Sequence, residues 1–394
     1  MQVGLVGKPS SGKSTTFKAL TLAEVETAAY PFTTIEPNKG FGHVRVPCAE
    51  TAFDTTCNPK HGYCVKGTRF VPVEMLDVAG LVPGAHEGKG LGNKFLDDLR
   101  QADALIHVID ASGSTNEKGE AVEEGSHDPL QDVIFLETEI DLWFLSVLKK
   151  GWSKLSREAQ VSGTKVEESL AKQLSGLDVK EEHIKDAIRA LELDPAKPAD
   201  WSEDKLLAFA KHLRQQTKPI VIAANKMDLP TSKENIKRLQ EKHKLVVPCS
   251  AEAELTLKLA AKHELIDYIP GQKTFEVKGN LNDKQKEGLD KVKVLLDEYG
   301  STGVQQAIDT AVFKLLEYMA IFPGGVGKLE DSDGNRLPDC FLMKPGTTAL
   351  DFAFYLHTDF GKNFIRAVDV RTKRTIGKEQ ALKHEDVIEI VSGK

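Results

Sequence analysis

The sequence predicts an α/β protein with a doubly wound parallel sheet, an inserted helical segment and a small C-terminal α+β module. Short, continuously apolar runs, which are typical of strands covered on both faces, alternate with stretches of helical periodicity. One gap between two predicted strands, 112–218, is over a hundred residues long, whereas a crossover needs only about a dozen. Beyond Gly271 the pattern changes to helices and then to strands and turns. Two or three domains are expected for 394 residues.

The first domain is predicted to contain five strands with helices between them. The strand ranges are 2–7, 69–80, 104–111, 219–226 and 244–251. A glycine loop and a helix over 11–24 follow the first strand, and a helix over 234–243 precedes the last. Because strands that alternate with helices predict a parallel sheet covered on both faces, we expect this domain to occupy 1–112 and 217–275.

The long gap is predicted to be a helical insertion over 113–216. Apolar residues recur at helical spacing in three of its stretches, 128–152, 179–193 and 203–216. Its polar beginning, 113–128, is rich in turn-forming residues and predicts a mobile loop.

The rest of the chain is predicted to form a helical linker over 276–325 and a small module over 326–394. In this module a helix over 349–357 lies among strand-like segments, which predicts a ubiquitin-like α+β fold. Four aromatic side chains are expected in a core rather than on a stacking surface: Tyr318, Phe322, Phe341 and Phe352.

The composition is that of an ordinary globular protein, with 40% hydrophobic and 28% charged residues. A net charge of −7 argues against a wholly basic nucleic-acid binder. Five cysteines without a CxxC pair predict reduced thiols rather than a disulfide framework. The chain starts with a strand-like segment instead of a signal peptide, and its apolar runs are too short to span a bilayer. We therefore expect a cytoplasmic protein with no membrane partner.

A phosphate-binding loop is predicted between the first strand and the first helix. The segment GKPSSGKS fits the pattern G-x-x-x-x-G-K-[ST] and has the strand–loop–helix context that the pattern requires. Glycines let backbone N–H groups approach phosphate oxygens, and the helix N-terminus favours their charge. The lysine would neutralise the β- and γ-phosphates, and the serine would ligate Mg²⁺. A chance glycine turn is the alternative that this context disfavours. The predicted contacts are Gly7, Lys8, Pro9, Ser10, Ser11, Gly12, Lys13, Ser14 and Thr15.

The second strand ends in Asp77-Val-Ala-Gly80. An acid at this place can hold Mg²⁺ through water, and Gly80 can sense a γ-phosphate. An ordinary strand-end aspartate is the alternative, and the phosphate loop makes it the weaker one. Asp77 is therefore predicted to belong to the metal site, with Ser14.

The fourth and fifth predicted strands end in a base-recognition pattern, Asn225-Lys226-Met227-Asp228 and Cys249-Ser250-Ala251. The Asp228 carboxylate can accept two N–H bonds from guanine, whereas adenine would leave it partly unpaired at a cost of at least ~1–3 kcal/mol. Asn225 would brace the phosphate loop and the base, Lys226 would lie along the ring, and the Ala251 N–H would donate to guanine O6. A surface turn is the alternative for the first motif alone.

These four motifs resemble the G1, G3, G4 and G5 boxes of translation-factor-class GTPases. The stretches 30–37 and 77–96 are similar to the Obg family, and most of all to its YchF branch. Residues 343–353, with Leu356-His357, resemble a TGS domain, which is a β-grasp module. The resemblance covers nearly the whole chain and includes archaeal GTP-binding members. It implies a P-loop NTPase G domain with an inserted helical domain and a C-terminal TGS domain.

The resemblance also implies roles for residues in the two switch segments. Thr34 would be the switch I threonine that ligates Mg²⁺ with the γ-phosphate bound, and Thr33 stays open as its alternative. Residues 80–96 would be switch II, whose glycines let it reorder when the γ-phosphate leaves. Leu81 stands where many GTPases place a water-orienting glutamine, so slow intrinsic turnover is expected. His86 is a possible helper, with a surface histidine as the more ordinary interpretation.

The implied function is that of a regulatory GTPase that hydrolyses GTP to GDP and phosphate with Mg²⁺ and acts as a ribosome-linked switch. Lys13, Thr34 and Gly80 are its expected catalytic residues. Two alternatives stay open: an ATPase of the same fold, and a nucleotide-gated RNA or ribosome adaptor with incidental hydrolysis. Many YchF relatives carry a glutamate in place of Asp228 and prefer ATP, so the aspartate favours GTP. Ser10 replaces the asparagine of potassium-stimulated relatives, which puts potassium stimulation in doubt.

Two further groups of residues are noted for possible binding roles. The C-terminal module carries basic residues that could contact RNA phosphates, although a solvated surface explains them too. They are Lys362, Arg366, Arg371, Lys373, Arg374, Lys378 and Lys383, against Asp369 and Glu379. Cys48, Cys57, His61 and Cys64 could bind Zn²⁺, but their spacing lacks the usual CxxC. Ordinary thiols in a loop between strands are expected, and the protein is expected to be a monomer.

Overall fold

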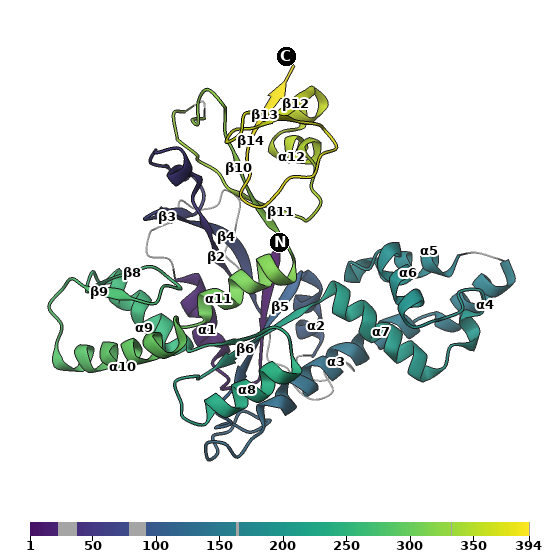
Figure 1. Ribbon diagram of the computed structural model, residues 1–394. Helices are drawn as coiled ribbons and strands as arrows, with labels where there is room; N and C mark the ends of the chain where they lie inside the picture. The colour runs from purple at the N-terminus through teal and green to yellow at the C-terminus, as the bar shows by residue number, and fades with distance from the viewer. Residues whose placement is uncertain (23–37, 79–91, 163–164, 332, 394) are drawn as a thin grey trace. The chain divides into compact units, whose positions relative to one another are not determined.

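The computed structural model describes residues 1–22, 38–78, 92–162, 165–331 and 333–393 (Figure 1). The chain divides into two compact units. Unit 1 comprises Met1–Phe17, Met75–Ala253 and Thr302–Ala307. Unit 2 comprises Lys18–Glu74, Glu254–Ser301 and Ile308–Lys394.

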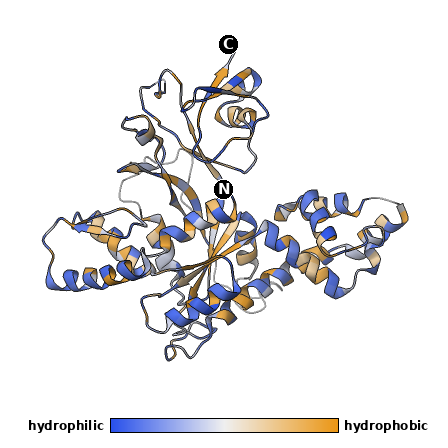
Figure 2. Cartoon of the chain, in the orientation of Figure 1, coloured by the Kyte–Doolittle hydropathy of each residue, from blue (hydrophilic) through white to orange (hydrophobic). Residues whose placement is uncertain are grey.

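Unit 1 is built on a parallel sheet in which β1, β5, β6 and β7 are neighbours in that order. Their bounds are Gln2–Val6, Ala104–Asp110, Ile220–Asn225 and Val246–Pro248. All seven residues of β5 are buried, and Figure 2 shows the apolar character of these strands. The predicted doubly wound α/β fold is confirmed. The order brings the carboxyl ends of β1, β5 and β6 to one edge of the sheet, where ligands bind in such folds.

Helices of unit 1 cover the sheet and form the inserted helical segment. They are α1 (Lys13–Thr21, which continues into unit 2), α2 (Gly92–Gln101), α3 (Pro129–Lys149), α4 (Trp152–Ser162), α5 (Val166–Gln173), α6 (Glu181–Ala190), α7 (Glu203–Thr217) and α8 (Ser232–Lys242). Asp128 caps α3 by accepting a hydrogen bond from the Leu130 N–H, and Pro129 occupies the first turn. One continuous apolar core joins the sheet to the insertion through buried Phe144 and Phe209.

Unit 2 begins with strands β2 (Lys39–Pro47), β3 (Tyr63–Val65) and β4 (Thr68–Asp77), the last of which ends in unit 1. The sequence predicted only the last of these three. β3 and β4 form an antiparallel hairpin with Cys64 opposite Arg69. The further elements before the C-terminal module are η1 (Ala49–Ala52), α9 (Ala251–Lys262), β8 (Ile266–Tyr268), β9 (Phe275–Val277) and α10 (Asp283–Tyr299).

The C-terminal module is a five-stranded sheet in the order β11-β10-β14-β12-β13 with two helices. Its elements are β10 (Met319–Pro323), β11 (Phe341–Met343), α12 (Ala349–Leu356), α13 (Thr358–Lys362), β12 (Phe364–Asp369), β13 (Arg374–Ile376) and β14 (Val387–Ser392). The predicted α+β module is confirmed. Phe322 and Phe352 are fully buried and Phe341 packs on the core, as expected, while Tyr318 is half-buried.

The linker that was expected to be helical over 276–325 is helical only in part. The chain leaves α10 through Gly300, at φ 79°, and starts again with α11 (Val304–Asp309). A π-helical turn follows over Thr310–Leu315, and β10 then begins at Met319. Gly303 is required at the break, because a Cβ there would lie 1.7 Å from the Pro248 carbonyl oxygen.

None of the helices in the described part of the chain combines the length and the apolar character that crossing a lipid bilayer requires.

Candidate nucleotide-binding site

The loop between β1 and α1 has the backbone shape that the phosphate-binding pattern demands. Ser10 has φ 60° and Gly12 has φ 93°, both in the left-handed region. A Cβ on Gly7 would lie 2.5 Å from the Val108 carbonyl oxygen, and one on Gly12 would lie 2.0 Å from Nδ2 of Asn225. Neither position therefore has room for a side chain. The loop runs directly into the N-terminus of α1, where a run of N–H groups favours an anion.

Asn225 joins the phosphate loop to the segment that follows β7. Its Nδ2 donates to the Ser11 carbonyl at 2.9 Å, and its Oδ1 accepts from the Ala251 N–H at 2.9 Å. The side chain is buried, so both hydrogen bonds are shielded from water. Asn225 thus bonds the phosphate loop, which it was predicted to brace, and it also bonds the segment after β7. The Ala251 N–H is directed at Asn225, so a bond to guanine O6 would have to share this donor.

Asp228 lies at the predicted base end of the site. It is exposed, and within the described part of the chain its carboxylate has no hydrogen-bond or ion-pair partner. The turn before it is firmly held, because Met227 donates its N–H to the Cys249 carbonyl at 3.0 Å. Ser232 Oγ donates to the Lys226 carbonyl at 2.6 Å. Ser250 donates its N–H to the Thr302 carbonyl at 2.8 Å. A hydrogen-bonded turn therefore presents a carboxylate that is unpaired among the described residues.

The phosphate end of the site carries a cation and an acid in contact. The Lys13 ammonium is hydrogen-bonded to Oδ1 of Asp77. Ser14 is exposed on the first turn of α1, and Thr15 behind it is half-buried. A hydroxyl and a carboxylate are oxygen ligands of the kind that Mg²⁺ prefers.

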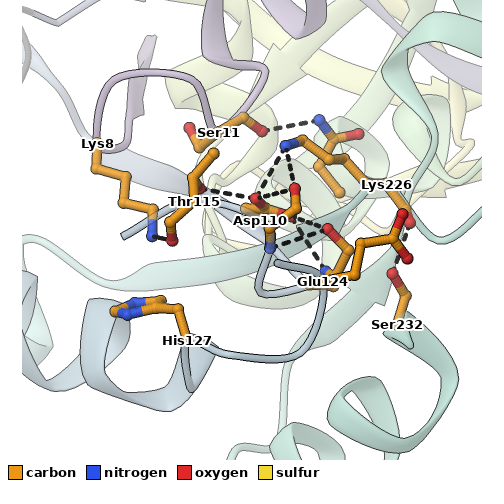
Figure 3. A network of polar contacts seen from close by, with 12 residues as sticks. Lys8, Ser11, Asp110, Thr115, Glu124, His127, Lys226 and Ser232 are labelled. Carbon is orange, nitrogen blue, oxygen red and sulfur yellow. Dashed lines mark hydrogen bonds and ion pairs between the residues drawn. The ribbon is translucent and has the colours of Figure 1, made fainter. Parts of the chain in front are cut away.

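Lys8 occupies an unexpected place for a residue predicted to contact nucleotide. Its side chain is only 7% exposed and forms an ion pair with Asp132 of α3 at 2.9 Å. Its Nζ also donates to the Thr115 carbonyl at 2.7 Å (Figure 3). His127 bonds the other oxygen of Asp132 at 2.8 Å. The ammonium of Lys8 is therefore committed to the protein, and only its backbone is available to a phosphate.

Asp110, at the end of β5, is the main site residue that the sequence did not predict. It is fully buried and accepts hydrogen bonds from Lys226 Nζ at 2.9 Å and Thr115 Oγ1 at 2.7 Å (Figure 3). Burial acts to raise the pKa of Asp110, but the hydrogen bonds from Lys226, Ser112 and Thr115 outweigh it and hold this pKa below its ordinary value. The sequence shows only that Asp110 ends an apolar strand, and the strand pairing places it beside the strand that ends in Asn225.

The ammonium of Lys226 belongs to the same network. The backbone of Lys226 is left-handed, with φ 64°. Its ammonium donates to Asp110 at 2.9 Å and to Ser114 Oγ at 3.1 Å. Only the aliphatic part of the side chain remains to lie along a base. Ser114 and Thr115 start the loop 113–128, which the sequence predicted to be mobile. Hydrogen bonds hold this loop in place, such as that from the His127 N–H to the Gly113 carbonyl at 3.2 Å.

Several predicted residues lie outside the described residues. These are Thr33, Thr34, Gly80, Leu81 and His86. The catalytic roles expected of Thr34 and Gly80 therefore stay predictions. Pro9 and Ser10 are exposed at the tip of the phosphate loop.

The other two groups of predicted binding residues lie in unit 2. The structure brings together Cys48, Cys57 and Cys64 with Glu50, whose possible ligand atoms all lie within 4.8 Å of one another. His61 is not part of this group. The expectation of ordinary thiols stays a prediction, and the alternative of a Zn²⁺ site now concerns the three cysteines and Glu50. The seven basic residues of the C-terminal module, from Lys362 to Lys383, are all exposed.

Three family descriptions match the chain. Residues 2–138 match a 50S ribosome-binding GTPase family, 223–325 match the G4 motif-containing domain of an Obg-like GTPase, and 330–392 match the TGS domain. The last match agrees with the five-stranded module described above.

Relatives match over nearly the full length. An uncharacterized GTP-binding protein of Methanocaldococcus jannaschii is 48% identical over 99% of this chain and 98% of its own. The ribosome-binding ATPase YchF of Bacillus subtilis is 30% identical over 94% of this chain and 88% of its own. The crystal structure of a GTP-binding protein from Pyrococcus horikoshii OT3 is 40% identical, covers 100% of both chains and has a TM-score of 0.80. The chain belongs to the YchF/Obg-like GTPase family, with its P-loop G domain, helical insertion and C-terminal TGS domain.

Proposed function

We propose that the protein binds GTP with Mg²⁺, hydrolyses it slowly to GDP and phosphate, and acts as a nucleotide-dependent switch. One observation carries this proposal. Buried Asn225 bonds the phosphate loop at Ser11 and the base segment at Ala251. Exposed Asp228 lies three residues further along the chain, and its carboxylate has no partner among the residues that the structure describes.

The choice of guanine over adenine follows from the hydrogen bonds that Asp228 can accept. Guanine presents two N–H donors side by side, N1–H and the 2-amino group, which match the two oxygens of a carboxylate. Adenine presents an acceptor at N1 and no 2-amino group. Leaving one charged oxygen without its bond costs about 1–3 kcal/mol, which corresponds to a preference of roughly 5- to 150-fold.

The residues at the phosphate end fit a magnesium ion. Ser14 and Asp77 offer a hydroxyl and a carboxylate, and of the two Asp77 oxygens only Oδ1 is bonded to Lys13. Mg²⁺ held there would neutralise charge on the β- and γ-phosphates. Lys13 would stabilise the charge that develops during transfer, and the N–H groups at the start of α1 would orient the phosphates. Thr34 is proposed as a further metal ligand.

A link to the ribosome is proposed from the relatives and the C-terminal module. The Bacillus subtilis relative is named a ribosome-binding ATPase, and the TGS module of this chain exposes a group of basic side chains. Such a surface favours contact with RNA phosphates. This partner also implies a cytoplasmic location.

An ATPase of the same fold is the second candidate, because relatives are named ATPases. Equilibrium binding of GTP, GDP, ATP and ADP analogues by the wild type and Asp228→Glu separates the two. The proposal predicts a guanine preference that collapses in the variant, since the longer side chain displaces the carboxylate. Equal or stronger binding of adenine nucleotides by the wild type would favour the ATPase. Release of phosphate under saturating GTP then measures turnover.

A further inference from the structure

Three cysteines and a glutamate of unit 2, none of them a predicted nucleotide contact, form a compact cluster. Cys48 follows β2, Cys57 lies in the loop after η1, and Cys64 is the central residue of β3. The Sγ atoms of Cys48 and Cys57 are 3.6 Å apart, and Cys64 Sγ is 3.2 Å from Oε1 of Glu50. All five cysteines of the chain are free thiols. The cluster is thus made of three soft ligands and one carboxylate.

We propose that Cys48, Cys57, Cys64 and Glu50 bind a zinc ion in a tetrahedral structural site. With Zn–S bonds of about 2.3 Å, two thiolates at tetrahedral angles lie ~3.8 Å apart, close to the Cys48–Cys57 separation. A disulfide would require about 2.05 Å. All four ligand atoms already lie within 4.8 Å of one another, so small side-chain shifts suffice. Sulfur-rich tetrahedral sets select zinc over magnesium or calcium.

The carboxylate is oriented as metal ligands usually are. Oε2 of Glu50 accepts the backbone N–H of Cys57 at 2.7 Å, which leaves Oε1 facing the sulfur atoms. A bond of this kind fixes the direction of a ligand. A metal would also have a route to the site, because an open pocket is lined by Glu50, Cys57 and Cys64.

Arg69 supplies an independent reason for negative charge at the cluster. It lies opposite Cys64 in the β3–β4 hairpin and its side chain is fully buried. Its Nη2 donates to the Leu337 carbonyl at 2.6 Å and lies 3.9 Å from Cys48 Sγ. Nε and Nη1 have no hydrogen-bond partner, and no carboxylate in the described part of the chain forms an ion pair with Arg69. An unbalanced buried charge is costly, and a zinc–thiolate centre, which carries net negative charge, balances it.

The site would brace the loop that contacts the start of the TGS segment. Asn58 donates its N–H to the Arg336 carbonyl at 2.9 Å, and Lys60 does the same to the Pro338 carbonyl at 2.9 Å. The Lys60 ammonium also pairs with Asp331 at 2.6 Å. Because Cys57 directly precedes this loop, a metal bound to Cys57 and Cys64 would hold both of its ends.

Metal content and cobalt spectroscopy on the full chain, freed of any affinity tag, test the proposal. Inductively coupled plasma mass spectrometry should find about one zinc per chain. Co²⁺ exchanged for zinc should show ligand-field bands of a tetrahedral site and thiolate-to-cobalt charge transfer. Cys57→Ser should lose the bound zinc, while Cys340→Ala, which removes a buried thiol of the same unit, should keep it. Glu50→Gln should weaken zinc binding and retain the thiolate bands.

Amide hydrogen exchange gives a second readout that does not depend on a variant. Removing zinc from the wild type with a chelator should speed exchange at Asn58 and Lys60, and added zinc should restore protection. A wild-type protein that takes up no zinc from a zinc-containing buffer would overturn the proposal. So would equal zinc in Cys57→Ser and Cys340→Ala, cobalt spectra without thiolate bands, or iron as the bound metal.

Discussion

At the scale of single residues, Gly12 of the phosphate loop is required both by its backbone conformation and by the side chain beside it. Gly12 has a left-handed backbone at φ 93°. A Cβ at this position would also clash with Nδ2 of Asn225. The first feature alone is tolerated at modest cost in many turns. The second is specific to this site, because moving Asn225 breaks its bonds to Ser11 and Ala251.

We predict that Gly12→Ala lowers the affinity for nucleotide at least ~100-fold, since it displaces Asn225 as well as straining the loop. Gly151→Ala is the matched control. Gly151 has φ 77° and open space where a Cβ would be, so its substitution costs about 1 kcal/mol of stability and leaves binding unchanged. Titration with a fluorescent GTP analogue measures both. Equal affinity in the two variants would show that Asn225 does not brace the site.

His107 gives a prediction on pH. Burial lowers the pKa of His107 to about 3, helped by the charge of Lys8. The unfolded chain therefore takes up a proton below about pH 6.5, while the folded chain does not until about pH 3. The free energy of unfolding therefore loses nothing to His107 above about pH 6.5. Below that pH it falls by at most ~1.4 kcal/mol per pH unit until about pH 3.

His107→Leu should remove this part of the slope. Urea unfolding at pH 7, 6 and 5, followed by a probe in unit 1, measures the free energy of unfolding in both proteins. His43, whose pKa burial lowers to about 4, lies in unit 2 and keeps its contribution in the variant. Equal slopes in the two proteins would show that the pKa of His107 is not lowered in the folded chain.

At the scale of elements, the ion pair between Lys8 and Asp132 ties the phosphate loop to α3. Both side chains are only 7% exposed. We predict that Asp132→Ala lowers the free energy of unfolding by about 3–5 kcal/mol, because it leaves a buried ammonium without its counter-charge. Lys8→Met combined with Asp132→Leu should recover most of that loss, since it removes both charges. Chemical denaturation of the wild type and the two variants measures the loss and its recovery. A double variant as unstable as Asp132→Ala would contradict it.

Elements differ in how far the sequence could predict them. β5 and β6 are continuously apolar and buried, so their periodicity identified them directly. β2 was missed because its two glycines and its basic residues interrupt the apolar pattern. β10 was taken for the end of a helix, since α11 and the π turn before it share its apolar character. Only tertiary pairing with β11 and β14 decides its conformation.

The residues of the binding sites also differ in how far the sequence could predict them. Motifs with a fixed spacing, such as Gly7–Ser14 and Asn225–Asp228, placed their residues at one edge of the sheet. Asp110 and the Cys48–Glu50–Cys57–Cys64 cluster have no such spacing. They meet through strand order and hairpin register, which depend on the fold as a whole. Lys8 was predicted to contact nucleotide, and the burial of its side chain against α3 follows from packing alone.

At the scale of the whole molecule, we predict that the basic side chains of the TGS module contribute to binding ribosomal RNA. Changing Arg371, Lys373 and Arg374 to glutamate should weaken binding. It should also make the plot of log binding constant against log salt concentration less steep, by about 0.7–0.9 for each RNA phosphate that the variant no longer neutralises. Reversing Lys284, Lys286 and Lys291 on α10 changes the net charge equally and should have a smaller effect. Ribosome co-sedimentation at several salt concentrations measures this. An equal decrease in binding by the two variants would indicate a general charge effect.

The central claim is that Asp228 makes this protein specific for guanine, and a base-swap measurement tests it most directly. Asn in place of Asp offers one donor and one acceptor, which matches the N1–H and O2 edge of xanthine and mismatches guanine. We predict that Asp228→Asn loses about 10- to 100-fold in GTP affinity and gains a comparable factor for XTP. Asp204→Asn, an exposed change on α7, should bind both nucleotides as the wild type does. Unchanged GTP affinity in Asp228→Asn, with no gain for XTP, would contradict the account.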